Sequence, residues 1–203
     1  MADTAMLTAF AVTSLVIELT PGPNMAYLAL VAATEGRKAG YAAVMGVAVG
    51  LTFVGLAAAL GLTALISASP LAYQGLRWAG VGYLSWLAWD GWRGASETED
   101  HAEAGSAAIT FFRRGLITNL LNPKAAVFYV AVLPGFLPPV ATGGDVFTLT
   151  AIYVAVATGV HAGIVTAASA ARTWLSDAGR EKTMRRMLSL ALVAVAAWVV
   201  WKT

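Results

Sequence analysis

The 203-residue sequence contains no cysteine and few charged residues. The absence of cysteine excludes disulfide scaffolds, thiol redox relays and cysteine-ligated metal sites. Charged residues make up only 12% of the chain, and hydrophobic residues make up 59%. An ordinary soluble domain has about 25% charged residues, which coat a core that water would otherwise reach. The composition therefore excludes a typical soluble domain and a disordered chain, and it predicts an integral membrane protein.

The small number of charges also argues against nucleic acid as a partner. The net charge is +2 and the sequence pI is about 9.0. A high pI that arises from few charges is different from the basic patch that nucleic acid requires. The expected surroundings are instead a lipid bilayer, and we expect no nucleic-acid binding.

Crossing the hydrocarbon core takes about 20 apolar residues in a helix. The fold class that we predict is an all-α polytopic membrane protein with six transmembrane helices. The first stretch begins with Asp3 in place of a basic region, so we interpret it as a retained helix and not as a signal peptide. The last stretch is the shortest. The six stretches lie near residues 5–34, 40–66, 71–92, 115–137, 146–171 and 187–201.

Basic residues concentrate in the first, third and fifth connecting segments, of which the fifth includes Arg172 and Arg180. The positive-inside rule therefore predicts that the odd loops are cytoplasmic and that both termini lie outside. Arg77, near the outer end of the third stretch, is interpreted as an anchor. The acidic third loop, Ser96 to Ser106, is interpreted as a solvated linker. A metal-binding loop is the alternative, but one histidine beside scattered carboxylates lacks the spacing of metal ligands.

The six stretches divide into two halves with a shared pattern. Thr20-Pro21-Gly22-Pro23-Asn24 interrupts the first stretch, and Asn119-Leu120-Leu121-Asn122-Pro123-Lys124 interrupts the fourth. Because each half has an odd number of spans, the halves must have opposite orientations. We predict one membrane domain with two inverted three-helix repeats and interrupted helices one and four. Repeat one covers about residues 1–93, a cytoplasmic linker about 94–112, and repeat two about 113–203.

Small residues four positions apart recur in the middle stretch of each half. Gly46 and Gly50 in the second stretch correspond to Gly159 and Gly163 in the fifth. Such spacing lets helix backbones approach closely, either within one chain or between the chains of a homo-oligomer. The sequence leaves both arrangements open.

The two breaks predict a polar pocket at membrane depth. Proline and glycine interrupt helical hydrogen bonds, and the freed backbone groups must be buried in protein or face water. Glu18 precedes the first break and Lys124 ends the second. A zwitterionic amino acid would suit such a pocket, with its carboxylate at Lys124 and its ammonium at Glu18. The alternatives are a structural ion pair and a Lys124 side chain that extends to the cytoplasmic face.

Two residues are candidates for proton coupling. Glu18 is the best candidate carrier, and His161 lies near the middle of the fifth stretch. Histidine titrates near neutral pH, although a lone histidine in a helix bundle is more often a packing residue. Tyr153 is one of four tyrosines that either line the path or pack as aromatics. Asp90 and Arg93 are predicted to form a local surface pair.

Several motifs resemble those of the lysine exporter (LysE/RhtB) family. Besides the two breaks, they are Gly36-Arg37-Lys38-Ala39-Gly40, Phe112-Arg113-Arg114-Gly115 and Pro134-Gly135-Phe136. The resemblance implies a bacterial inner-membrane exporter of amino acids or related small metabolites, driven by the proton gradient as an antiporter, with no cofactor or metal. The family usually has a small or apolar residue at the place of Glu18. The substrate-binding residues that the resemblance indicates are Pro21, Gly22, Pro23, Asn24, Asn119, Asn122, Pro123 and Lys124.

The favoured function is proton-coupled export by alternating access around the broken helices. Its partners would be a small-molecule substrate and protons. The main alternative is a structural or assembly subunit of the membrane. An intramembrane enzyme would need a nucleophile with a base or a metal cluster, and a metal carrier would need clustered ligands. Neither arrangement is evident in the sequence, so we expect no enzymatic activity.

Overall fold

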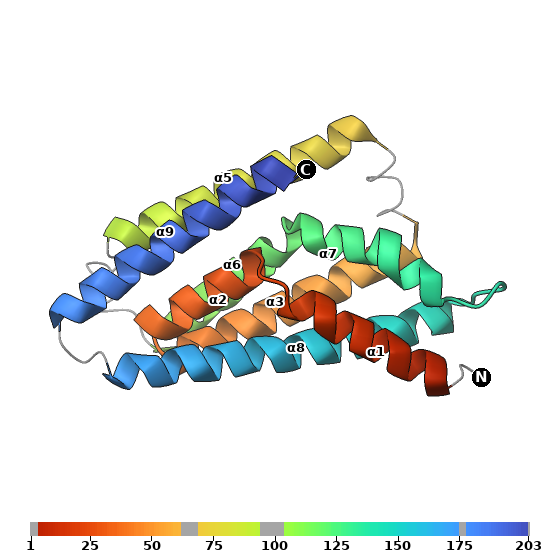
Figure 1. The fold of residues 1–203 in the computed structure, drawn as a ribbon, viewed down its shortest axis with the longest axis horizontal. Coiled ribbons are helices and arrows are strands. Elements are labelled where there is room, and N and C mark those ends of the chain that lie inside the picture. The colour runs from red at the N-terminus through yellow and green to blue at the C-terminus, as the bar shows by residue number, and fades with distance from the viewer. Residues whose placement is uncertain (1–3, 62–68, 94–103, 175–177, 203) are drawn as a thin grey trace.

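The computed structural model describes residues 4–61, 69–93, 104–174 and 178–202 (Figure 1). All regular secondary structure in these residues is helical, with a π-helix at η2 and a 3-10 helix at η3. The elements are α1 (Thr4–Leu19), α2 (Pro23–Thr34), α3 (Arg37–Ala59), α5 (Pro70–Arg93), α6 (Ala104–Leu120), α7 (Pro123–Val127), η2 (Phe128–Val132), η3 (Leu133–Phe136), α8 (Gly143–Trp174) and α9 (Ala178–Lys202).

Both predicted interruptions are present. Helix α1 meets α2 at an angle of 62°, and α6 meets the segment that begins with α7 at 51°. Pro23 and Pro123 each occupy the first position of the helix that follows the break. Proline suits that position because its missing N–H would have no partner within the helix. The sequence therefore places the two breaks correctly.

Length and composition support up to four membrane spans among the described residues. Helix α3 and residues 143–170 of α8 are each long and apolar enough to cross a membrane, and each bent pair adds one more if it is a single span. Helix α5 is long enough, but Arg77, Asp90 and its many Gly and Trp residues make it less apolar. In α9 the apolar part is restricted to Arg186–Trp201. The chain is thus a multi-pass membrane protein, and its third and sixth predicted spans are helices of lower hydropathy.

The helices pack in a reciprocal pattern. Helix α3 packs on α6, α8 packs on α1 and α2, and α3 and α8 contact each other. Helices α5 and α9 lie side by side as an antiparallel pair at one edge of the molecule (Figure 1), where α9 also contacts α2. The contacts of α3 with α6 and α8, and those of α8 with α1 and α2, each join one predicted half of the chain to the other.

Arg77 ties the α5·α9 pair together. Only 8% of its surface is exposed, and its Nη2 donates a hydrogen bond to the backbone carbonyl of Val200 in α9. Its Nη1 donates to Gln74 at 3.1 Å. This residue therefore links two helices, which differs from the membrane anchor that the sequence suggests.

Asp90 pairs with a different arginine from the one predicted. Its Oδ2 is 2.8 Å from Nη1 of Arg114 in α6. The guanidinium of Arg93 lies 5.6 Å from the ring centroid of Trp89, and that of Arg114 lies 5.3 Å from the ring of Trp86. The prediction of a local Asp90–Arg93 pair is wrong because α6 brings a closer cation to this face of α5. The ion pair joins α5 to α6.

The small residues of α3 and those of α8 pack differently within the chain. A Cβ on Gly46 would meet the backbone carbonyl of Phe112, and one on Gly50 would lie 2.9 Å from the Asn119 side chain. No atom lies within 4 Å of a Cβ placed on Gly159 or Gly163. Both of these glycines are exposed, because α8 contacts its neighbours through other faces. Within one chain, therefore, only the α3 pair mediates close packing, and contact between chains through the α8 pair stays a prediction.

Helix α6 begins earlier than the predicted linker allows. It starts at Ala104, whereas the linker was expected to extend to about residue 112. Ala107 and Ile109 are compatible with helix, and buried Phe111 gives this segment a packed face. The acidic part of the loop, residues 94–103, lies outside the described residues.

An aromatic cluster joins α1, the η2–η3 segment and α8. The ring of Phe10 in α1 lies 5.8 Å from that of Phe128 and 5.2 Å from that of Phe136. Phe128 in turn stacks on Tyr153 of α8, with ring centroids 3.6 Å apart. These contacts fix α1, η2 and α8 relative to one another, and they hold the polar residues that lie beside them.

Candidate functional site

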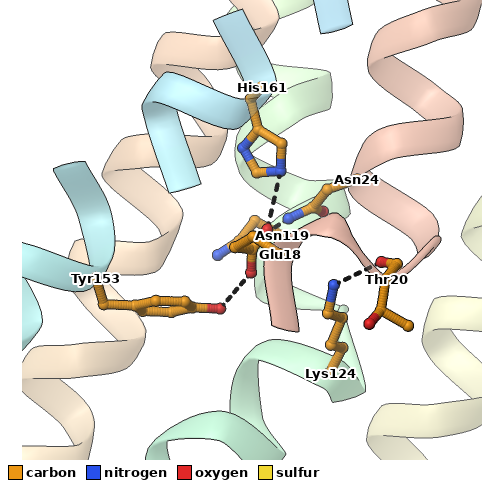
Figure 2. A network of polar contacts seen from close by, with 7 residues as sticks. All are labelled: Glu18, Thr20, Asn24, Asn119, Lys124, Tyr153 and His161. Atoms are coloured by element: carbon orange, nitrogen blue, oxygen red, sulfur yellow. Dashed lines mark hydrogen bonds and ion pairs between the residues drawn. The ribbon is translucent and has the colours of Figure 1, made fainter. Parts of the chain in front are cut away.

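Two hydrogen bonds join the two breaks. Nδ2 of Asn24, in the first turn of α2, donates to Oδ1 of Asn119 near the end of α6 at 2.9 Å. Nζ of Lys124, in α7, donates to the backbone carbonyl of Thr20 at 2.9 Å (Figure 2). Segments about 100 residues apart in the sequence therefore meet at one point. The structure brings the two predicted motifs together.

Local structure directs Lys124 toward the first break. Asn122 is the N-cap of α7, and its side chain accepts a hydrogen bond from the backbone N–H of Lys124 at 3.0 Å. Pro123 fixes the first position of that helix. A Cβ on Gly22 would lie 3.4 Å from Cδ and 3.9 Å from Nζ of Lys124. An added Cβ would therefore be in ordinary van der Waals contact with the lysine, which shows how closely Lys124 packs on this glycine.

Glu18 is held by two residues of α8. Its side chain is buried, with 4% of the residue exposed. Oε1 accepts a hydrogen bond from the Tyr153 hydroxyl at 2.7 Å, and Oε2 lies 3.3 Å from Nε2 of His161. Figure 2 shows the carboxylate between these two side chains. The His161 contact is an ion pair whenever the imidazole is protonated.

Glu18 and Lys124 do not form the direct ion pair that the sequence left open. Glu18 instead forms its ion pair with His161. Lys124 is half-buried, and its ammonium bonds to the Thr20 carbonyl instead of reaching a membrane surface. The two charges are therefore separate features of one site.

A small polar cavity lies between the breaks. Its volume is about 10 Å³, which is space for about one water molecule, so in this conformation it is nearly closed. Five of the predicted site residues line it, whereas Pro21 is exposed and Pro23, Asn119 and Pro123 are buried behind the lining. His161 adjoins the cavity through Glu18. The lining residues are Glu18, Gly22, Asn24, Met25, Asn122, Lys124, Ala125 and Tyr153.

Several buried polar atoms at this site have no hydrogen-bond partner among the described residues. They include Oδ1 of Asn24, Nδ2 of Asn119 and both ring nitrogens of His161. Nearly all buried polar groups in proteins are hydrogen-bonded, so unpaired ones require an explanation. A free acceptor on Asn24 and a free donor on Asn119, next to a cavity, are suited to a polar ligand.

Helix ends add to the electrostatics of the cavity. Gly22 caps α2 without a side-chain hydrogen bond, and the first N–H groups of a helix have no partner within it. This end of α2 carries a partial positive charge, and the Lys124 ammonium beside it carries a full one. Lys124 therefore lies between the C-terminal end of α1, whose carbonyl it binds, and the N-terminal end of α2. The lysine and the α2 terminus together attract an anion.

Thr20, Met25 and Ala125 were not predicted as site residues, and Tyr153 was predicted only as one of four tyrosines that either line the path or pack. Tyr153 and His161 are eight residues apart, which places them on the same face of α8 two turns apart. That spacing was a usable signal, but only the packing of α8 on α1 shows that the face meets Glu18. Within the described ranges no three His, Asp or Glu side chains gather as metal ligands.

The chain is similar to a family of translocators along most of its length. The sequence model described as LysE type translocator matches residues 15–203. The chain is 33% identical over 132 residues to the homoserine/homoserine lactone efflux protein of Salmonella typhimurium, covering 64% of each protein. It is 33% identical over 135 residues to the leucine efflux protein of an Enterobacter species, covering 66% of this chain and 64% of that protein.

A third relative is an uncharacterized membrane protein of Pseudomonas aeruginosa, 34% identical over 127 residues, or 60% of this chain and 59% of that protein. In each case the chain spans less than two thirds of the relative's length. No solved structure matches the chain.

Proposed function

The chain belongs to the LysE type translocator family, and from that premise we propose that it exports amino acids or related small metabolites across the bacterial inner membrane. A translocator family agrees with the expectation that the chain is not an enzyme. The main observation behind the proposal is the position of Lys124. This residue follows the second break, its ammonium binds the Thr20 carbonyl at the first break, and its side chain lines the cavity beside α2.

The substrate carboxylate would bind between Lys124 and the start of α2. An ammonium group and unpaired helical N–H groups both favour an anion at this point. The Lys124 ammonium already has one acceptor, the Thr20 carbonyl, so two of its three N–H bonds are free for a carboxylate. The proposed position of the substrate is therefore the cavity that Gly22 and Lys124 line, which would have to widen to admit it.

The amino group of the substrate would bind on the opposite side. Oδ1 of Asn24 is an unpaired acceptor, and the carboxylate of Glu18 lies in the same lining. Asn119, behind the lining, accepts a hydrogen bond from Nδ2 of Asn24 and thereby orients that amide. Oδ1 of Asn24 would gain a hydrogen bond only when substrate is present, and this gain would favour the loaded site over the empty one.

Proton coupling would act through Glu18 and His161. A proton that enters from outside and binds either residue makes the site more positive, which weakens the hold on the substrate ammonium and favours release. Loss of the proton to the cytoplasm restores the negative charge and permits rebinding. The 3.3 Å contact between Oε2 and Nε2 supports this assignment, because each charge state of one residue acts on the other.

Alternating access would use two inverted repeats. The reciprocal contacts support this, since α1 and α2 pack on α8 in the way that α6 packs on α3. Odd loops would be cytoplasmic and both termini outside. Rocking of one repeat against the other would open the cavity between the breaks to each side in turn.

The test is export from proteoliposomes loaded with labelled leucine or homoserine under an imposed pH gradient. We expect Lys124→Ala to reduce gradient-driven flux at least 10-fold, because a charged hydrogen bond contributes about 1.5–3 kcal/mol. The matched control is Lys38→Ala, which removes the same ammonium from an exposed position on α3.

Equal flux through wild type and Lys124→Ala would contradict the binding site. Absence of flux through the wild type with every amino acid tested would contradict the exporter and favour a structural or assembly subunit.

A further inference from the structure

Tyr153 connects the acid at the first break to the second broken helix. Its hydroxyl donates to Oε1 of Glu18 at 2.7 Å, and its ring stacks on Phe128 with centroids 3.6 Å apart and planes 12° apart. Phe128 is the first residue of η2 and follows directly after α7, which carries Lys124. One buried side chain therefore contacts both halves of the site.

The backbone at Phe128 is unusual for a membrane helix. Residues Phe128–Val132 form a π-helix inside the broken fourth span. Isolated π-helical turns are rare, and many lie at functional sites. Here the π-helical turn contains Phe128 and Tyr129, the two aromatic residues whose rings contact Tyr153.

We propose that Tyr153 is the positioning residue of the proton site. Its hydroxyl orients the Glu18 carboxylate, and its ring transmits a change in that carboxylate to the second broken helix through Phe128. The inference rests on the proposed function, since it assumes export coupled to protonation of Glu18. It adds a residue that neither the sequence motifs nor the proposed export mechanism includes.

Protonation of Glu18 changes its hydrogen bond with Tyr153. The charged Glu18 carboxylate accepts the Tyr153 proton, which stays covalently bound to the tyrosine oxygen. A proton taken up on Oε1 makes that oxygen a donor and the tyrosine oxygen its acceptor, so the hydroxyl proton turns away from Glu18. A proton taken up on Oε2, the oxygen beside His161, leaves Oε1 as a neutral and weaker acceptor of the same hydrogen bond. Either change alters the force on the Tyr153 hydroxyl, and the stacking of its ring on Phe128 would pass a shift of the side chain to η2.

Other titratable groups also face Glu18. His161 approaches from α8 at 3.3 Å, Lys124 acts on it electrostatically from α7, and Tyr129 does so from η2. Helix α2 contributes the neutral amide of Asn24 to the same cavity. A test of Tyr153 must therefore separate its hydroxyl from these groups.

The experiment measures gradient-driven export as a function of pH in proteoliposomes, together with substrate exchange at equal pH on both sides. The variant is Tyr153→Phe, which keeps the stacked ring and removes the hydroxyl. The control is Tyr129→Phe, which removes a buried hydroxyl that donates to the Leu51 carbonyl at 3.0 Å. Each substitution removes one buried hydrogen bond, but only Tyr153→Phe removes a hydrogen bond to Glu18.

We expect Tyr153→Phe to shift the pH profile of export by about one unit toward higher pH, with exchange retained, because a hydrogen bond to the charged carboxylate is lost. Tyr129→Phe should leave the profile in place. Glu18→Gln should lower gradient-driven export, and the pH profile of the flux that remains through His161 should not shift when Tyr153→Phe is added. Phe128→Leu should slow gradient-driven export more than exchange.

A Tyr153→Phe profile equal to that of Tyr129→Phe would overturn the role of the hydroxyl, as would a shift that persists with Glu18→Gln. Wild-type behaviour of Phe128→Leu would overturn the role of the ring. These outcomes are distinct from failure of the proposed function, in which the wild type itself shows no gradient-driven export. That last result would overturn both proposals.

Discussion

The hydrogen bond between Asn24 and Asn119 links residues on opposite sides of the site. Both side chains are buried, and each keeps an unpaired polar atom among the described residues. Removing either partner leaves the other amide buried with still fewer hydrogen bonds, which costs about 1–3 kcal/mol. This contact is a suitable place to measure coupling between the two breaks.

We predict that Asn24→Ala and Asn119→Ala each lower the stability of the protein by about 1–3 kcal/mol. The double variant should lose about 1 kcal/mol less than the sum of the two, because the interaction can be lost only once. Unfolding in mixed detergent micelles measures all four free energies. Simple additivity would show that the amides do not stabilise each other.

Some individual residues of the site can be identified from the sequence. Pro23, Pro123 and Asn122 act locally, because proline interrupts a helix and asparagine caps one wherever they lie. Lys124 and Glu18 are conspicuous because charges at membrane depth are rare. The pairing of Glu18 with Tyr153 and His161 depends on how α8 is rotated against α1. No local rule predicts that rotation.

Among the helices, the interface between α3 and α6 depends on the absence of side chains. Gly46 lies against the backbone of α6, where an added Cβ would meet the Phe112 carbonyl and would lie 2.8 Å from the Leu116 nitrogen. Gly115 lies likewise against the Ala43 backbone. Contact between backbones at this distance leaves no room for adjustment by rotamer changes.

Replacing Gly46 with alanine should separate α3 from α6 and destabilise the protein by about 1–3 kcal/mol. Gly163→Ala is the matched control on α8, where no atom lies within 4 Å of the added Cβ. Alanine favours helix by about 1 kcal/mol over glycine, so the control should keep or raise stability. Thermal unfolding in detergent compares the two. A loss with Gly163→Ala would show that another chain or a bound lipid covers this face.

These glycines show that the sequence predicts which helix faces permit close packing but not which helices pack there. The four-residue spacing of small residues is present in both middle helices, yet α3 uses it for packing and α8 does not. Spacing identifies a face that permits close approach. Which helix meets that face depends on contacts between segments that are distant in the chain, and the same limit applies to Asp90 and Arg114.

At the scale of the whole molecule, the absence of cysteine makes orientation directly measurable. Lys38 and Ala141 are exposed and lie at the start of α3 and between η3 and α8. The charge distribution assigns the first to the cytoplasm and the second to the outside. A single cysteine at either position would be the sole thiol in the chain.

We predict that Ala141→Cys reacts with a membrane-impermeant maleimide in intact cells whose outer membrane has been permeabilised. Lys38→Cys should react only after the inner membrane is opened. The unsubstituted protein, which has no thiol, is the control for background labelling. The reverse pattern would invert the orientation, and equal access to both sites from outside would contradict the assignment of these segments to opposite sides.

The pairing of α5 with α9 has a consequence for how the protein is made. Helix α5 ends at Arg93, and α9 ends about 100 residues later at Lys202. At roughly 5–20 residues per second, the ribosome takes roughly 5–20 s to synthesise that stretch. Throughout this interval Arg77 lacks the Val200 carbonyl that it binds in the finished fold. Until the last helix is made, the partner of the guanidinium within α5 is Gln74, and its second hydrogen bond, which locks α5 to α9, forms only at the end of synthesis.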